Sequence, residues 1–436
     1  MLSAGTSSID ITPPVGCYLQ GHSARNKPAE CVHDPIRLKA ITISDGHRRA
    51  AIITSDVVYF SKEVIKSLRA VVKERLNIPP ENLFVTAAHV HTGPYLFATS
   101  DKDRAKIVPE YVNSLPLRIA GCIADAVYNE EKILLKFGTG SANIGIINRR
   151  LKTDKGVMMM PDSKRPVDEQ VTVLGIVRPD GSPKAILANY ACHPTTLATD
   201  IFQISADYPG VFQRVVEQLY PDAIACFLYG CSGDVRPAII DGSEFKGGSF
   251  ADCERMGRIL AGETMKVFEK ANPIPSGKLS GVLKTVRLPL DRSYLPTSAK
   301  RLRELVRLHA RRISSNVNAP EIRAWKQYWR DALGKRAPVS SFVPCEIQAL
   351  KIGRLGIIGI AAEVMVEIGL QIKEKSAGAP LIVCSCANAP IGYLPTTEAL
   401  RDGGYETASF LTRKFAAPYA PAMEQILIRE VVHLLK

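Results

Sequence analysis

Histidines stand where two apolar runs of the sequence end. His89 and His91 follow the run Leu83–Ala88, and His193 follows the run Ala185–Ala191. The chain has only eight histidines, and three of them occupy these exits. Imidazole nitrogens bind zinc and exchange protons near neutral pH. The positions therefore predict a metal site or an acid–base site.

The spacing of His89 and His91 predicts how their side chains are oriented. In an extended chain, residues i and i+2 point to the same side. Both imidazoles would then face one cleft, one as a metal ligand and the other as an acid, a base or an outer donor. Thr92-Gly93-Pro94 would end the strand and allow close backbone approach. Alone, this motif is weak, because structural histidines are common at strand ends.

A glutamate completes a known zinc set. Glu363 follows the apolar run Leu355–Ile360, and two histidines, a glutamate and an open position form a catalytic zinc site. In the alternative interpretation Glu363 is only a carboxylate at a helix start, since Glu367 follows one turn later. Aspartates near strand ends or turns are alternative ligands: Asp34, Asp56 and Asp207.

The elements that must position these residues alternate between β-rich and helical patterns. This alternation predicts an α/β fold with a mixed, largely buried β-sheet core covered by helices. Ligands bind beyond the carboxyl ends of strands in such sheets, so we expect the site residues to converge. Ala271–Gly277 is typical of a connector, but site residues on both sides of it favour one domain over residues 1–436. Strands are expected at Ala50–Thr54, Leu83–Ala88, Val171–Val177, Ala185–Ala191, Ala223–Tyr229, Leu355–Ile360 and Leu381–Cys384, and helices at Glu63–Leu76, Tyr111–Asn129, Val211–Leu219, Cys253–Ala271, Met365–Lys375 and Met423–Leu435.

An inserted basic helical hairpin is expected over residues 297–336. This stretch holds eleven Lys or Arg against three acids, and so +8 of the net charge of +13. Asn318-Ala319-Pro320 indicates its turn, and Trp325 and Trp329, one helical turn apart, are expected to pack on the neighbouring helix. We favour a solvated helical pair. The alternative is a peripheral contact with an anionic surface, either lipid headgroups or an acidic partner.

Composition limits the functional classes further. The chain is 46% hydrophobic and 23% charged, as in ordinary globular proteins. No apolar run reaches the ~18 residues that span a bilayer, and Met1–Gly5 lack the features of a signal peptide. The ten cysteines form no CxxC pair. We expect a cytoplasmic protein with reduced thiols and no nucleic-acid partner.

Short motifs follow one another in a characteristic order along nearly the whole chain. They are Asp10-Ile11-Thr12-Pro13-Pro14, Thr86-Ala87-Ala88-His89-Val90-His91-Thr92-Gly93-Pro94, Asn148-Arg149, Asn189-Tyr190-Ala191-Cys192-His193-Pro194-Thr195, Ser205-Ala206-Asp207-Tyr208-Pro209-Gly210, Gly233-Asp234-Val235, Glu363, Gly392-Tyr393-Leu394-Pro395-Thr396-Thr397 and Gly404-Tyr405-Glu406. In this order the motifs resemble the catalytic domain of the neutral (non-lysosomal) ceramidase family.

The resemblance implies a hydrolase that uses one zinc ion to cleave an amide. Carried over by motif, the metal ligands would be His89, His193, Glu363 and Tyr393. A tyrosine ligand requires a metal strong enough to depress a phenol pKa that is normally near ~10. The residues lining the reacting centre would be His91, Arg149 and Tyr405.

The sequence departs from the family at three places. The family's serine nucleophile follows Gly-Asp-Val, and here that position is Arg236, while Ser232 lies four residues earlier. The Pro-Gly before the ligand glutamate is Ala361-Ala362. The C-terminal β-sandwich is missing, so we expect a relative that consists of the catalytic domain only. An arginine at the serine position argues against ceramide itself as the substrate.

We therefore predict a zinc-dependent hydrolase that cleaves a small-molecule or lipid-like amide, through water activated by Zn²⁺. Asp234 and Arg236 are expected at the cleft. Arg236 either pairs with Asp234 or Asp207 and braces its loop, or binds an anionic group of the substrate. The same machinery suits an ester or a phosphoester. The rival hypothesis is a non-catalytic binding protein on the same fold.

Overall fold

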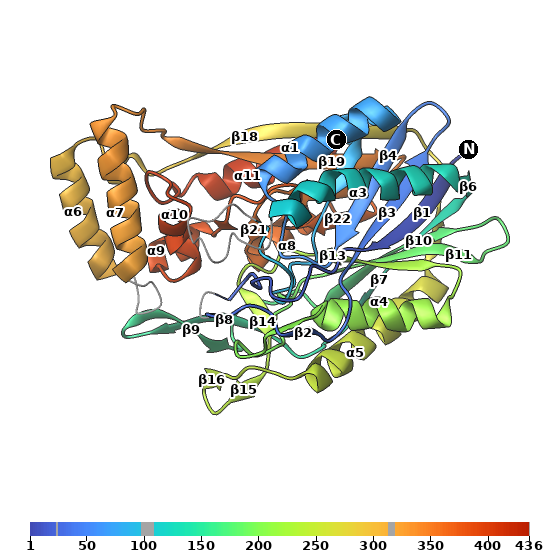
Figure 1. Cartoon of the computed structure of the whole chain (residues 1–436), viewed down its shortest axis with the longest axis horizontal. Helices are drawn as coiled ribbons and strands as arrows, with labels where there is room; N and C mark the ends of the chain where they lie inside the picture. The colour runs from blue at the N-terminus through green and yellow to red at the C-terminus, as the bar shows by residue number, and fades with distance from the viewer. Residues whose placement is uncertain (23–24, 97–108, 313–318, 436) are drawn as a thin grey trace.

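Three β-sheets turn apolar faces toward one shared core in the computed structural model, which describes residues 1–22, 25–96, 109–312 and 319–435 (Figure 1). The first sheet has the order β5 (Leu83–Val85), β4 (Arg49–Ser55), β3 (Arg37–Ser44), β1 (Ser3–Asp10) and β6 (Glu131–Lys132). The second has the order β13 (Ile224–Tyr229), β11 (Pro183–Tyr190), β10 (Gln170–Val177), β7 (Leu134–Ser141) and β17 (Asn272–Ile274). The third has the order β18 (Leu279–Pro289), β19 (Phe342–Ile352), β20 (Leu355–Ile360) and β22 (Leu381–Cys384).

The shared core takes side chains from every one of these sheets. Ile52 of β4, Leu187 of β11 and Ile357 of β20 belong to one buried cluster. Strands that are buried on both faces have nearly continuous apolar sequences. This is why the predicted strands are found within a few residues of their expected bounds.

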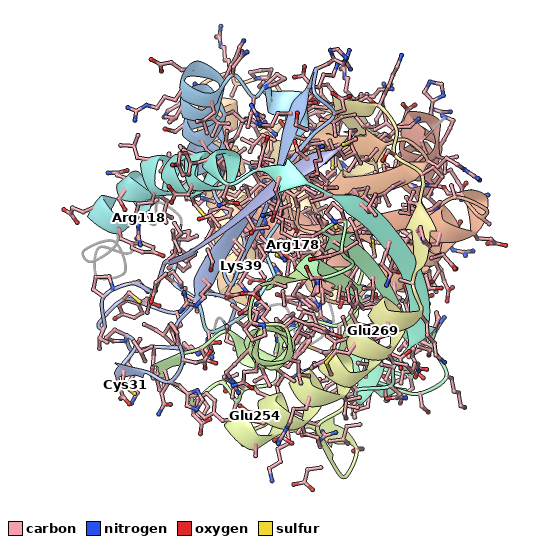
Figure 2. The ribbon with its side chains drawn as sticks, turned by 90° about the vertical axis from the view of Figure 1, so that its right-hand side faces the viewer. Cys31, Lys39, Arg118, Arg178, Glu254 and Glu269 are labelled. Atoms are coloured by element: carbon pink, nitrogen blue, oxygen red, sulfur yellow. The ribbon has the colours of Figure 1, made fainter. Side chains whose placement is uncertain are left out.

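Pairs of helices cover the outer faces of the sheets. Separate apolar clusters join each pair to its sheet. In Figure 2, α3, which carries Arg118, and α5, which carries Glu254 and Glu269, lie on different sides of the strands. Ser249 caps α5 through a reciprocal pair of hydrogen bonds with Asp252. The pairs are α1 (Lys62–Leu76) with α3 (Pro109–Tyr128), α4 (Asp207–Leu219) with α5 (Phe250–Lys270), and α8 (Val366–Lys375) with α11 (Met423–Leu435).

The basic hairpin is an insertion between two paired strands. Helices α6 (Ala299–Arg312) and α7 (Ala319–Gly334) stand at the left end of Figure 1, and β18 and β19, which flank them, pair antiparallel along their whole length. Trp325 and Trp329 are buried, and both indoles donate hydrogen bonds to the carbonyl of Phe415. The tryptophans share a buried cluster with Leu302 and Leu305 of α6, as expected, and they also fasten the hairpin to the rest of the molecule, which was not expected. The expected turn at Asn318 lies outside the described residues.

Short strands complete the frame of the site. They are β14 (Val235–Pro237), β8 (Ile146–Thr153) and β9 (Gly156–Asp162) in one sheet, β21 (Glu363–Val364) with β23 (Tyr393–Leu394), β2 (Cys31–Val32) with β12 (Gln203–Ile204), and β15 (Ile240–Asp241) with β16 (Glu244–Phe245). The remaining helical turns are η1 (Pro80–Asn82), η2 (Arg292–Tyr294), α9 (Thr397–Asp402), η3 (Glu406–Ala408) and α10 (Ser409–Thr412).

Two sequence predictions about this frame need correction. The expected connector Ala271–Gly277 contains β17, an edge strand paired with β7, where Pro273 is tolerated because an edge needs fewer N–H donors. The expected strand Leu83–Ala88 already ends at Val85. In the described part of the chain, no helix has the length and apolarity needed to cross a membrane.

Candidate metal centre

Each of the three sheets leads into one candidate ligand. His89 follows β5, His193 follows β11 and Glu363 follows β20. The two Nε2 atoms of His89 and His193 are 3.2 Å apart. An oxygen of the Glu363 carboxylate lies 3.4 Å from Nε2 of His89 and 3.7 Å from Nε2 of His193. All three side chains are buried, so the ends of three separate sheets meet at one point.

Backbone carbonyls orient both imidazole rings. Nδ1 of His89 lies 3.0 Å from the carbonyl oxygen of Val58, and Nδ1 of His193 lies 2.7 Å from that of Ser232. A carbonyl only accepts, so each Nδ1 must carry the proton and donate it. With Nδ1 as the donor, the Nε2 atoms of both rings face each other and Glu363. Such outer hydrogen bonds are typical of metal-binding histidines.

The protonation states also fit a cation at this point. Burial lowers the pKa of His193 to about 4, so its ring is neutral at neutral pH. Burial alone would raise the pKa of Glu363, but His89 and His193 hold it well below its usual range. A buried carboxylate that faces two imidazole nitrogens needs positive charge beside it, which either a proton on a ring or a bound cation can supply. The residues therefore fit a divalent metal.

The backbone of His89 differs from the extended conformation expected for His89-Val90-His91. His89 has φ +67°, in the left-handed region, which is uncommon for a residue with a side chain. Its amide donates to the carbonyl of Val57 at 2.9 Å, which holds the turn. Strain of this kind is concentrated at functional sites. The two rings still face one cleft, through a turn and not through strand alternation.

His91 completes a second, overlapping set of ligand atoms. Its ring centroid is 5.1 Å from that of His89 and 5.7 Å from that of His193. One ligand atom from each of these three histidines lies within 4.8 Å of the others. Nδ1 of His91 is buried and has no hydrogen-bond partner among the described residues, and burial lowers the pKa of the ring well below its usual value. His91 is thus available either as a ligand or for proton transfer.

Arg149 and two tyrosines form one wall of this centre. Arg149 donates to the hydroxyl of Tyr393 at 3.2 Å and to a carboxylate oxygen of Glu406 at 2.9 Å. Its guanidinium lies 5.6 Å from the ring of Tyr393 and 5.7 Å from that of Tyr405. Burial and the charge of Glu363 raise the pKa of Tyr393 well above its usual value. Glu363 and Tyr393 are paired residues of β21 and β23, which brings both predicted ligands together.

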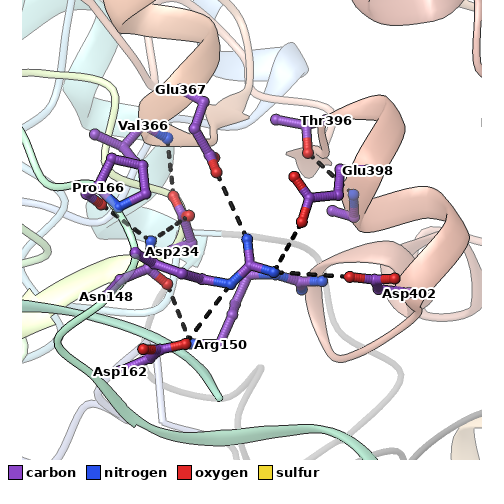
Figure 3. Close-up of polar contacts among 12 residues, drawn as sticks. Asn148, Arg150, Asp162, Pro166, Asp234, Val366, Glu367, Thr396, Glu398 and Asp402 are labelled. Atoms are coloured by element: carbon purple, nitrogen blue, oxygen red, sulfur yellow. Dashed lines mark hydrogen bonds and ion pairs between the residues drawn. The ribbon is translucent and has the colours of Figure 1, made fainter. Parts of the chain in front are cut away.

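Asp234 is used in hydrogen bonds that support the centre. Its carboxylate accepts from the side chain of Asn148 and from the amide of Val366, both at 2.8 Å (Figure 3). Val366 is the first residue of α8, so Asp234 holds the start of that helix against β8. The alternative aspartate ligands are engaged in the same way, by backbone amides or polar side chains: Asp34, Asp56 and Asp207.

Arg236 lies in β14, next to the strand that carries Arg149. It has neither Asp234 nor Asp207 as an ion-pair partner, and no carboxylate of the described residues is within pairing distance. Its guanidinium instead stacks on Phe245, 4.3 Å from the ring centroid. Burial and the charge of Arg149 lower its pKa to about 10, so it remains charged at neutral pH.

Four further residues at the centre were not identified from the sequence. Tyr229 stacks on His89 with centroids 5.0 Å apart, and Cys386 approaches Nδ1 of His89 at 3.4 Å. Arg413 lies 4.0 Å from Glu363, and Glu406 binds Arg149. Tyr229 ends an apolar run, the signal that also marks the histidines, and could have been found.

The comparisons with known proteins agree on one family. The model of the neutral/alkaline non-lysosomal ceramidase N-terminal family matches residues 2–265. Neutral ceramidase of Mycobacterium tuberculosis (strain ATCC 25618 / H37Rv) is 22% identical over 485 residues, covering 94% of this chain and 74% of that protein.

Solved structures give the same fold. The crystal structure of neutral ceramidase from Pseudomonas aeruginosa matches with a TM-score of 0.75 and 18% identity, over 100% of this chain and 74% of that one. A structure of a ceramidase complexed with C2 matches with the same values. At this level of identity the likeness shows the fold, including the mixed α/β architecture.

Proposed function

This chain belongs to the neutral/alkaline non-lysosomal ceramidase family, and from that premise we propose that it is a zinc-dependent hydrolase of a small-molecule or lipid-like amide. The observation that carries the proposal is the convergence of His89, His193 and Glu363 from three sheets on one buried point. Two neutral imidazoles and one carboxylate form a donor set that suits zinc, with room for a further ligand. Tyr393, beside Glu363, is our proposed fourth ligand.

Zinc held there would act as a Lewis acid, lowering the pKa of water from ~15.7 toward ~7 and polarising the scissile carbonyl. His91 is our proposed general acid and base, because its Nδ1 is buried, unpartnered and close to the rings of both histidine ligands. It would take a proton from the attacking water and deliver one to the leaving amine. A serine nucleophile is not required.

Arg149 is our proposed stabiliser of negative charge in the reaction. Its contact with the hydroxyl of Tyr393 places a guanidinium beside the centre, where it can hold a phenolate or a developing oxyanion. Tyr405 is 37% exposed and would contact the substrate at the rim. Asp234 would act by positioning β8 and α8. Because one core joins all three sheets, we also propose that residues 1–436 form a single domain.

The proposal is tested by removing and restoring the metal. Protein treated with a zinc chelator should lose turnover of an N-acyl amide panel, and added zinc should restore it. His47→Ala, at an exposed histidine far from the site in sequence, is the matched control and should behave like the wild type. Full turnover by the metal-free protein would refute the mechanism. A zinc-loaded wild type that turns over no amide, ester or phosphoester would favour the non-catalytic alternative.

A further inference from the structure

Among the described residues, several buried polar atoms without hydrogen-bond partners lie in segments that adjoin the metal centre. They are Nε2 of His22, Nδ1 of His91, the hydroxyl of Thr195 and Nε of Arg236. Buried polar groups are almost always hydrogen-bonded, so unpaired ones that gather in one place indicate where a ligand binds. These four groups come from separate segments of the chain.

Backbone contacts hold these segments against each other. The amide of His91 donates to the carbonyl of Pro194 at 3.2 Å, and the amide of His193 donates to the carbonyl of Val235 at 3.1 Å. The loop that carries Thr195 is therefore fastened both to His91 and to β14. Arg236 is the next residue of β14, so its side chain starts at the edge of the metal centre.

His22 is held at the same place by a tightly packed loop. Its ring meets that of His91 edge to face, with centroids 4.9 Å apart. A Cβ on Gly21 would lie 2.3 Å from Cγ of His91, and Gly21 has φ +107°, so only glycine permits this approach. Arg25 donates to the carbonyl oxygen of His91. Burial, followed by the charges of Arg25 and Arg236, lowers the pKa of His22 to about 3.

The charges around the centre leave Arg236 without compensation. Arg149 is matched by Glu406, and Arg413 donates to the hydroxyl of Tyr59 at 2.7 Å and lies within 4.0 Å of Glu363. Among the described residues, Arg236 contacts the face of Phe245 and has no ion-pair partner. Nε of Arg236 is buried without a partner in the same part of the chain, and the side chain as a whole is partly buried. A bound anion would supply both an acceptor for these N–H donors and a counter-charge.

We propose that Arg236 and His22 form an anion-binding subsite beside the metal centre, and that the substrate is an acyl amide with a carboxylate or a phosphate near its scissile bond. The inference rests on the proposed hydrolase function and specifies its substrate class. The planar guanidinium offers two parallel N–H donors that match a carboxylate or phosphate. Stacking on Phe245 fixes its plane, and the neutral imidazole of His22 can supply a further donor.

Matched substrates test this assignment. The carboxylate pair is N-dodecanoylglycine against N-dodecanoylglycinamide, and the phosphate pair is N-dodecanoyl phosphoethanolamine against N-dodecanoylethanolamine. The wild type should prefer the anionic member of at least one pair in kcat/KM, and the pair showing the preference identifies the anion. Arg236→Gln should reduce that preference by about 10–100-fold, the worth of one or two charge-assisted hydrogen bonds. Arg236→Lys keeps the charge without the paired donors and should fall between the two.

The control is Arg429→Gln, whose side chain is 71% exposed, and it should keep the wild-type preference. Melting temperatures show whether each variant is folded. A preference that is absent from the wild type, or unchanged in folded Arg236→Gln, would overturn the subsite.

A binding measurement separates this inference from the hydrolase proposal. Calorimetric titration with octanoate, octylphosphonate and octanol needs no turnover. The wild type should bind at least one anion ten or more times tighter than octanol, and Arg236→Gln should lose most of that difference. This result without amide turnover would leave the subsite standing and the hydrolase proposal refuted. Turnover of neutral amides with no anion binding would refute the subsite and leave the hydrolase proposal standing.

Discussion

Two neighbouring strands present an arginine to the metal centre in opposite ways. Arg149 of β8 is buried and bound by Glu406, by the carbonyl oxygen of Gly233 at 2.7 Å and by Tyr393. Arg236 of β14 is half-buried and stacks on the ring of Phe245, with no ion-pair partner in the part of the chain that the structure describes. The two strands pair directly in one sheet, with Arg236 opposite Ile147. We call these the paired wall and the unpaired wall.

The difference in partners distinguishes an arginine that supports the structure from an arginine that can bind a ligand. A network that is satisfied within the protein is rigid and holds its members in place. Arg150 extends the paired wall, since it also binds Glu406. An arginine that is held in position but lacks a counter-ion keeps its hydrogen-bonding capacity for the substrate. The paired wall should therefore control stability, and the unpaired wall should control selectivity.

The largest effect is expected at Glu363, which lies beside Tyr393 of the paired wall. Glu363→Gln removes a carboxylate that approaches both ligand histidines. Without its charge, metal affinity should fall. We expect kcat/KM to drop by more than the ~10²–10³-fold that losing one oxyanion donor costs. Steady-state kinetics in zinc-buffered solution measures this, and a loss below tenfold would be inconsistent with a ligand role.

The next effect concerns the stability of the paired wall. Glu406→Gln leaves two buried guanidinium groups, those of Arg149 and Arg150, with no carboxylate between them. Removing one member of a buried ion pair costs about 3–5 kcal/mol. Urea unfolding should show a loss of that order. The control Glu304→Gln breaks an exposed pair with Arg301 and should cost less than ~1 kcal/mol. Equal losses for both variants would show that the wall is not a stabilising network.

A smaller effect, on binding to anionic lipid, is expected at the basic hairpin, where arginine side chains are exposed to solvent. Arg303 and Arg307 are exposed on α6. If the hairpin contacts anionic lipid, each arginine should contribute about 1 kcal/mol to binding, in a salt-dependent manner. Co-sedimentation of the wild type and Arg303→Gln/Arg307→Gln with phosphatidylserine vesicles at low and high salt measures this. Equal recovery with anionic and neutral vesicles would rule out the lipid contact and leave a solvated helical pair.

The smallest effect is expected for the stability of the unpaired wall. Arg236→Gln breaks no ion pair within the described residues, so the free energy of unfolding should change by less than ~1 kcal/mol. Arg149→Gln, measured in the same experiment, should be much more destabilising. If the two variants lose similar stability, Arg236 is part of the scaffold, and the contrast between the walls fails.

The sequence predicted the ligand residues at the strand ends better than it predicted the sheets that position them. Apolar runs that end in His89, His193 and Glu363 are visible because buried strands are continuously apolar. The strands β1, β8 and β18 were missed, because their sequences mix small or charged residues with apolar ones. Three separate sheets around one core could not be deduced, since strand pairing is non-local.

Long-range partners escaped prediction for the same reason. Arg149 and Glu406 are 257 residues apart in sequence, and no local pattern links them. The alternative in which Arg236 pairs with Asp234 or Asp207 relied on nearby carboxylates, and those are already engaged by Asn148, Val366 and backbone amides. The stacking partner Phe245 comes from a short hairpin that the sequence did not indicate.

The most direct test of this account is the metal content of the purified protein. Elemental analysis should find about one zinc per chain in the wild type and in the control His47→Ala. It should find little or none in His89→Ala and His193→Ala, with far-ultraviolet circular dichroism showing that both variants are folded. Unchanged metal in both folded variants would contradict the central claim that the ends of three sheets converge to hold a zinc ion.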